Sequence, residues 1–225
     1  MLKIQSIHLQ KFLIKWLNFF IHRPEKSSLK IIGVGPGDPS LLTLAAVDAI
    51  KKSSVIFYPV SGENKESHAA NIVKKYIKLK RKIPIIFPMA RKEFDAQDIW
   101  RGAAKEIFWY LSNKHTVSLL CLGDTSIYAS SYNIMKEFEH SYPQIDVKII
   151  PGISSFSVAA SLSNFQLIKN EETLEIFECP KDSKGLFKLL NNKNKKVLVI
   201  MKVGKKWKWV KKFLKKESLI KETVL

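Results

Sequence analysis

From Leu29 onward, short runs rich in β-branched residues alternate with segments of helical period. Such alternation is typical of repeated βα units, which build a largely parallel sheet with helices on its faces. The runs are nearly continuous in apolar character, as strands buried on both faces should be. We therefore predict an α/β fold, whose first five strands are residues 30–34, 55–60, 83–88, 117–122 and 147–150.

A second, smaller α/β set is predicted after residue 153, with strands 174–177 and 197–203 and a helix over 207–216. Trp207, Val210 and Leu214 lie on one side of that helix and lysines cover the rest, so we expect a cationic surface helix. The predicted domains are therefore residues 29–153 and 154–225, preceded by an amphipathic basic extension over residues 1–28. The apolar stretch of that extension is shorter than a membrane span, so no stable membrane association is expected.

Helical period also predicts which side of two further helices faces the core. We expect these side chains to be buried: Ile99, Ala103, Ile107 and Leu111 in one helix, and Ile72, Tyr76 and Leu79 in the other. The first helix is predicted to begin at Asp38, a good N-cap, with Pro39 in the first turn, where a missing N–H costs nothing.

The charge balance is strongly basic, with 38 Lys and Arg against 20 Asp and Glu, a formal net charge of +18. This excess favours a polyanionic partner, although lysines dispersed over a solvated surface would give the same total. Cys121 and Cys179 form no CxxC pair, and the five histidines have no metal-ligand spacing. We therefore expect no disulfide, no bound metal and a reducing compartment, the cytoplasm.

Glycine-rich turns follow three of the predicted strands, at residues 33–39, 122–128 and 151–155. The first differs from a dinucleotide-binding turn, because Asp38 stands where the third glycine would be and Pro36 lacks an amide donor. An aspartate at a helix start repels phosphate, so NAD is disfavoured and a ligand with a positive centre fits better. Since ligands of α/β sheets bind beyond the carboxyl ends of the strands, the three turns predict one pocket for an adenosyl ligand.

These turns belong to an ordered set of motifs, IIGVGPGDPSLLTLAAVDAI, SVIFYP, CLGDTSIYAS, IIPGISSFSVAA and VLVIMKVG. From about Leu29 to the end, the set resembles the tetrapyrrole (corrin and sirohaem) methylases. The resemblance implies two α/β domains with S-adenosylmethionine held between them and a small-molecule tetrapyrrole as substrate. FYPVS, PMARKE at residues 88–93, SSFSVAA and MKVG are most similar to the members that methylate carbon 20 of precorrin-2 or cobalt-precorrin-2 in cobalamin biosynthesis.

Matching motif to motif, the resemblance implies a cofactor pocket formed by Pro36, Leu122, Gly123, Asp124, Ile127, Ser154, Ser155 and Met201. Asp124 would meet the methionine part of the cofactor. A proton must leave carbon 20 after methylation, and Asp38 is the first candidate acceptor, with Tyr128 second. A helix N-cap is at least as good an interpretation of Asp38, and a packed aromatic is the better interpretation of Tyr128. Arg91, Lys92 and Lys202 are candidates to bind substrate carboxylates.

Two departures from the family pattern leave alternatives open. Thr125 replaces the proline of the usual Gly-Asp-Pro turn, and the chain ends at Leu225 where relatives continue, so we expect an incomplete second domain. An unpaired strand edge there would favour a homodimer. The alternatives are another methylase of this fold or an inactive truncated remnant. Trp207 and Trp209 among lysines read as a helix face, so no nucleic-acid partner is predicted.

Overall fold

The computed structural model describes residues 28–87, 93–191 and 196–224. The chain divides into two compact units, Met1–Ile153 and Ser154–Leu225. The predicted basic extension lies outside the described residues except for Ser28. Arg91 and Lys92, with most of the PMARKE segment, also lie outside them.

The first unit is built on a five-stranded sheet with the order β3-β2-β4-β1-β5. Every neighbouring pair in this sheet is parallel. Each predicted strand is present with its ends within two residues of the prediction, and the α/β class is confirmed. The strands are β1 (Ser28–Gly33), β2 (Val55–Val60), β3 (Arg81–Ile86), β4 (Val117–Cys121) and β5 (Asp146–Ile150).

Burial differs between the centre and the edges of this sheet. All residues of β1 and β4 are buried, as predicted for strands covered on both faces. The same prediction is wrong for β3 and β5, where most residues are exposed or half-buried. These two strands are the sheet edges, so each has a neighbour on one side only. Their apolar runs therefore indicate strands but not full burial.

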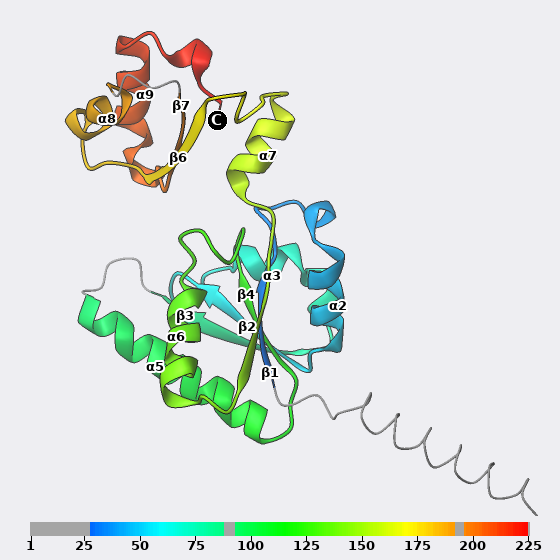
Figure 1. The fold of residues 1–225 in the computed structure, drawn as a ribbon. Coiled ribbons are helices and arrows are strands. Elements are labelled where there is room, and N and C mark those ends of the chain that lie inside the picture. The colour runs from blue at the N-terminus through cyan, green and yellow to red at the C-terminus, as the bar shows by residue number, and fades with distance from the viewer. Residues whose placement is uncertain (1–27, 88–92, 192–195, 225) are drawn as a thin grey trace, which may run out of the picture. The chain divides into compact units, whose positions relative to one another are not determined.

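Helices cover both faces of the sheet, and Figure 1 shows α5 and α6 on one side with α2 on the other. Alternate residues of β1 pack on opposite faces of the sheet. Ile31 packs with α5 (Glu93–Ser112) and α6 (Ser131–Ser141). Ile32 packs in the other core with α2 (Leu44–Lys52), α3 (His68–Ile72) and α4 (Lys74–Ile77). This two-sided packing is the reason the central strands read as continuous apolar runs.

The predicted core stripes are confirmed in one helix and partly wrong in the other. Ala103, Ile107 and Leu111 of α5 are buried, and Ile99 packs against them. Leu79 is 97% exposed, whereas Ile77 is buried at 3% exposure. The segment forms two short helices, α3 and α4, so a single helical period does not run through it.

The N-cap at Asp38 is present, but it begins a short 3-10 helix. The Ser40 amide donates to Asp38 Oδ1 at 2.7 Å, at the start of η1 (Pro39–Leu41). The α-helix α2 starts at Leu44, where Thr43 Oγ1 accepts a hydrogen bond from Ala46 N at 3.1 Å.

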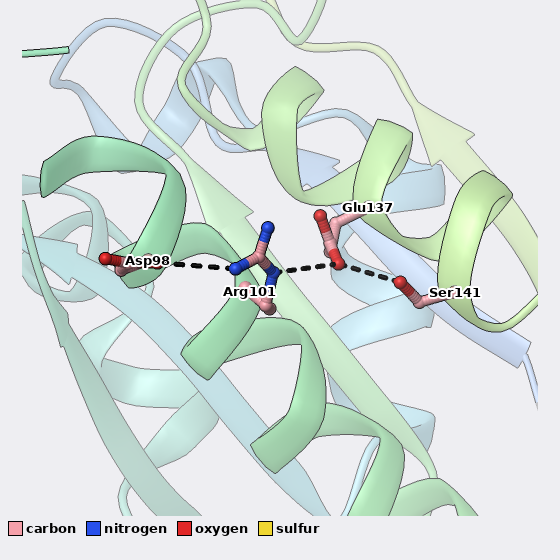
Figure 2. Close-up of polar contacts among 4 residues, drawn as sticks. All are labelled: Asp98, Arg101, Glu137 and Ser141. Carbon is pink, nitrogen blue, oxygen red and sulfur yellow. Dashed lines mark hydrogen bonds and ion pairs between the residues drawn. The ribbon is translucent and has the colours of Figure 1, made fainter. Parts of the chain in front are cut away.

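A small polar network joins α5 to α6 at the surface (Figure 2). Arg101 Nε lies 3.9 Å from Glu137 Oε1, and Arg101 Nη1 lies 3.4 Å from Asp98 Oδ1. Ser141 Oγ also donates to Glu137 Oε1 at 2.8 Å. Ion pairs at the protein surface contribute about 1 kcal/mol or less, so the apolar contacts between α5 and α6 contribute most to holding the two helices together.

The second unit contains a two-stranded parallel sheet, β6 paired with β7. Lys196 Nζ binds Glu175 Oε2 across the two strands at 3.1 Å. The predicted cationic helix is confirmed as α9, with Val210 and Phe213 buried and its lysines exposed. The elements are α7 (Ser155–Leu162), β6 (Thr173–Glu178), α8 (Ser183–Leu190), β7 (Lys196–Met201), η2 (Gly204–Lys206), α9 (Trp207–Lys216) and η3 (Ile220–Glu222). Among the described residues, no helix has the length and apolar content to span a membrane.

Candidate functional site

The turns after β1 and β4 pair with each other directly. Gly35 N donates to Gly123 O at 3.2 Å, and Gly123 N donates to Gly35 O at 2.8 Å. Both glycines have positive φ, 76° and 75°, a conformation that other residues adopt only with strain. The two predicted glycine turns therefore form one paired structure beyond the carboxyl ends of adjacent strands.

The turn after β5 packs against this pair at close range. A Cβ atom added to Gly152 would lie 2.2 Å from Gly123 O, and one added to Gly33 would lie 2.4 Å from Gly152 N. No side chain fits at either position, because backbone atoms of the three turns occupy that space. The three turns meet, as the strand-end rule predicts.

Asp124 links the turn after β4 to the turn after β5. Its Oδ2 accepts a hydrogen bond from Gly152 N at 3.0 Å, and its Oδ1 accepts from Ser126 N at 2.9 Å and from Ser126 Oγ. Partial burial opposes ionisation of the carboxyl, but these hydrogen bonds outweigh it and lower the pKa of Asp124. The carboxylate is thus ionised at neutral pH and holds two loops together.

A cavity of about 440 Å³ lies at the same edge of the sheet. Its walls include Pro36 and Leu122, two of the predicted site residues, together with Gly37 and Pro39. The remaining lining residues, His68, Asn71 and Ile72, come from α3, and none of the three is a predicted site residue. The sequence contains one signal for these residues, because α3 follows β2 and therefore begins at the sheet edge where the glycine turns gather.

Ser67 fixes the start of α3 against the end of β2. Its hydroxyl donates to Pro59 O at 2.7 Å and accepts from Ala70 N at 3.3 Å. Further along the helix, Asn71 Nδ2 donates to Glu66 Oε2 at 3.1 Å. The cavity wall formed by α3 is therefore anchored to a strand end, in the same way as the glycine turns.

The remaining candidates in the first unit lie on the turn after β1 and on the loop after β4. Asp38 is exposed and caps η1, and the hydrogen bonds from the amide and hydroxyl of Ser40 lower its pKa. Tyr128 is 43% exposed and has a positive φ of 50°. Ile127 is half-buried on the loop between β4 and α6. Cys121 is a free, buried thiol beneath the same turn, and burial raises its pKa.

Three predicted cofactor residues belong to the second unit. Ser154 is the N-cap residue of α7, and Ser155 is the first residue of that helix. Ser155 Oγ donates to Met201 Sδ at 4.0 Å, which brings the start of α7 to the end of β7. Lys202 follows directly, exposed and with a positive φ of 55°.

The chemistry of these groups suits a ligand that carries positive charge. Asp38 and Asp124 place carboxylates on the two paired turns, and Pro36 supplies no amide proton. A phosphate would need amide donors and no nearby carboxylate, so the residues fit a cationic adenosyl ligand better than a dinucleotide. In the parts of the chain that the structure describes, no group of three or more His, Cys, Asp or Glu side chains is placed to hold a metal ion.

Comparison with known proteins gives a family match along most of the chain. The family model described as Tetrapyrrole (Corrin/Porphyrin) Methylases matches residues 28–224. A protein of Methanocaldococcus jannaschii named "Probable cobalt-precorrin-2 C(20)-methyltransferase" is 32% identical over 151 residues, which are 67% of this chain and 64% of that protein. A precorrin-2 C(20)-methyltransferase of a Sinorhizobium species is 26% identical over 183 residues, 77% of this chain and 72% of that protein.

The chain thus spans just under two thirds of the M. jannaschii protein. Among solved structures, a cobalt-precorrin-4 methyltransferase superimposes with a TM-score of 0.57 at 19% identity, covering 86% of this chain and 76% of that one. At this identity the likeness is one of fold.

Proposed function

Because the chain belongs to the tetrapyrrole (corrin/porphyrin) methylase family, we propose that it transfers a methyl group from S-adenosylmethionine to carbon 20 of precorrin-2 or cobalt-precorrin-2. The M. jannaschii and Sinorhizobium relatives, whose names carry this activity, support the choice of substrate and position. The reaction would be a step of cobalamin biosynthesis. Another methylase of the same fold is the alternative.

The observation that carries the proposal is the junction of three glycine turns through Asp124 at the carboxyl edge of the sheet. When bound, S-adenosylmethionine supplies an electrophilic methyl group on a positively charged sulfur. Pro36, Leu122, Gly123 and Ile127 would hold it on the first unit, with the ionised Asp124 toward its charged methionine part. We propose the second unit as the second domain, and a role in cofactor binding for its residues Ser154, Ser155 and Met201 stays a prediction.

The protein's own contribution to such a reaction is orientation and the exclusion of water. Methyl transfer to an electron-rich ring carbon is an in-line displacement, which needs the two reactants held at close range and needs no nucleophile from the protein. Leu122 and Pro36 give the cavity an apolar lining suited to this task. The excess positive charge, with Lys202 near the end of β7, suits a substrate that carries many carboxylates. A homodimer and a cytoplasmic location stay predictions.

The proposal is tested by calorimetric titration of the purified chain with S-adenosylhomocysteine. We expect micromolar binding that Asp124→Ala abolishes and that the control Asp48→Ala, an exposed carboxylate on α2 paired with Lys52, leaves unchanged. A methylation assay with precorrin-2 then tests the substrate. A folded wild-type chain that binds no S-adenosylhomocysteine would overturn the proposal and favour an inactive remnant.

A further inference from the structure

The reaction proposed above releases one proton, and the cavity contains a group that can take it. We propose that His68 is the catalytic base that removes the proton from carbon 20 of the tetrapyrrole after methyl transfer. This inference rests on the proposed function and adds to it the identity of the proton acceptor. It replaces Asp38 and Tyr128, the acceptors expected from the sequence.

The first support is position. His68, Asn71 and Ile72 are spaced i, i+3 and i+4 on α3, so they share one face of the helix, and all three line the cavity. Pro36 and Leu122, which we assign to the cofactor pocket, line the same cavity. A proton acceptor on this wall therefore stands beside the place where the methyl donor would be held.

The second support is chemistry. Among the residues that line the cavity, His68 alone has an ionisable side chain. Imidazole is the side chain best suited to accept and release a proton near neutral pH, which makes histidine the most frequent general base in enzymes. Ser67, the residue before His68, donates a hydrogen bond to Pro59 O and accepts one from Ala70 N, so the base is carried on an anchored turn of the chain.

The expected acceptors are less suitable. Asp38 directs Oδ1 to Ser40 N, and the resulting decrease of its pKa makes it a weaker base; exposure does not distinguish the two residues, because His68 is exposed as well. It is also absent from the cavity lining, although both its neighbours, Gly37 and Pro39, belong to it. Tyr128 is likewise not among the lining residues.

Methyl transfer and proton removal conserve atoms and electrons. A π electron pair of the ring forms the new bond between carbon 20 and the methyl carbon, while the bond from that methyl to sulfur breaks and its electron pair stays on sulfur. The ring then carries one additional positive charge. A ring nitrogen of His68 takes the proton from carbon 20, the carbon–hydrogen pair returns to the ring system, and the imidazolium later gives the proton to water.

The test compares His68→Gln and His68→Ala with His140→Gln, an exposed histidine near the end of α6 that serves as a matched control. We expect both His68 variants to bind S-adenosylhomocysteine like the wild type but to show kcat reduced by about 100-fold or more. Added imidazole should restore part of kcat to His68→Ala and none to Asp38→Ala. Deuterium at carbon 20 should slow the His68 variants more than the wild type, because proton removal becomes rate-limiting.

Several results would overturn the inference. Wild-type kcat in His68→Gln, or a rise in KM alone, would mean that His68 is not the base. Loss of kcat in Asp38→Asn or Tyr128→Phe with none in His68→Gln would return the role to those residues. An active wild type with unaffected His68 variants overturns only this inference, whereas a wild type that binds S-adenosylhomocysteine but methylates neither precorrin-2 nor cobalt-precorrin-2 overturns the proposed function as well.

Discussion

Gly152 N donates a hydrogen bond to Asp124 Oδ2 at 3.0 Å, so a side chain on the turn after β4 holds the backbone of the turn after β5. The other carboxylate oxygen is taken by Ser126 N and Ser126 Oγ. Asp124 therefore has a structural role that its motif alone does not reveal. Any contact it makes with a cofactor would come in addition to these bonds, and its substitution changes both.

This structural role of Asp124 predicts that the free energy of unfolding depends on pH in the acid range. Because the folded pKa of Asp124 lies below the usual 3.8, its stabilisation is fully present above about pH 5 and is lost as the pH falls through the folded pKa. Asp124→Asn should lower the free energy of unfolding by about 1–3 kcal/mol at pH 7, since the amide nitrogen of Asn accepts no hydrogen bond and either Gly152 N or the Ser126 donors would lose their acceptor. Denaturant unfolding at pH 7, 5, 4 and 3 should show the difference from wild type constant to pH 5 and shrinking below it. A difference that grows in acid would contradict this account, and Asp48→Asn is the control.

The close approach of the glycine turns predicts a strong effect of one added methyl group. Gly152→Ala should lower the free energy of unfolding by about 3 kcal/mol or more, because the new Cβ would overlap Gly123 O and Gly33 C. Gly102→Ala is the matched control, since nothing lies within 4 Å of a Cβ in that α5 position. It should raise stability by about 0.5–1 kcal/mol through helix propensity. Equal effects of the two substitutions in chemical denaturation would refute the packing described for the three turns.

The sequence predicts those parts of the fold that depend on patterns within a short segment of the chain. The strands and α9 follow from β-branched runs and helical period, and the meeting of the glycine turns follows from the geometry of parallel strands. The prediction for Leu79 is wrong because α4 ends at Ile77, so Leu79 lies beyond the helix whose period predicted its burial. The partial exposure of β3 and β5 depends on strand order, which their own sequences do not encode.

In the candidate site too, residues within local motifs could be predicted, whereas those placed by tertiary packing could not. Pro36 and Leu122 were accessible to motif reasoning because they lie inside glycine turns. His68 has no such context, and its place in the cavity depends on how Ser67 ties α3 to Pro59. Likewise, the partner of Asp124 is 28 residues away in the chain, so its hydrogen bond could not be read from spacing.

The two sides of α9 predict opposite outcomes for neighbouring residues. Phe213 is 7% exposed and packs with Cys179, Leu186 and Val210, so Phe213→Ala should lower the free energy of unfolding by about 3 kcal/mol. Lys212→Ala, on the exposed side, should change it by less than about 0.5 kcal/mol. Thermal and denaturant unfolding followed by circular dichroism measure both. A large loss from Lys212→Ala would mean that the lysine side of the helix is packed and not solvated.

Substitution of Leu122 should weaken ligand binding with little effect on the free energy of unfolding. It is 46% exposed, although it is large and apolar, and it lines the cavity between the glycine turns and α3. Leu122→Ala should therefore change the free energy of unfolding by less than about 1 kcal/mol. Because the proposed pocket uses that side chain, the affinity for S-adenosylhomocysteine should fall about threefold to tenfold, the equivalent of about 0.7–1.4 kcal/mol of lost contact. Leu79→Ala, at a position 97% exposed and absent from the cavity lining, should leave the affinity unchanged in the same calorimetric titration. Unaltered affinity in Leu122→Ala would move the cofactor pocket away from this cavity, and with it the base assigned to His68.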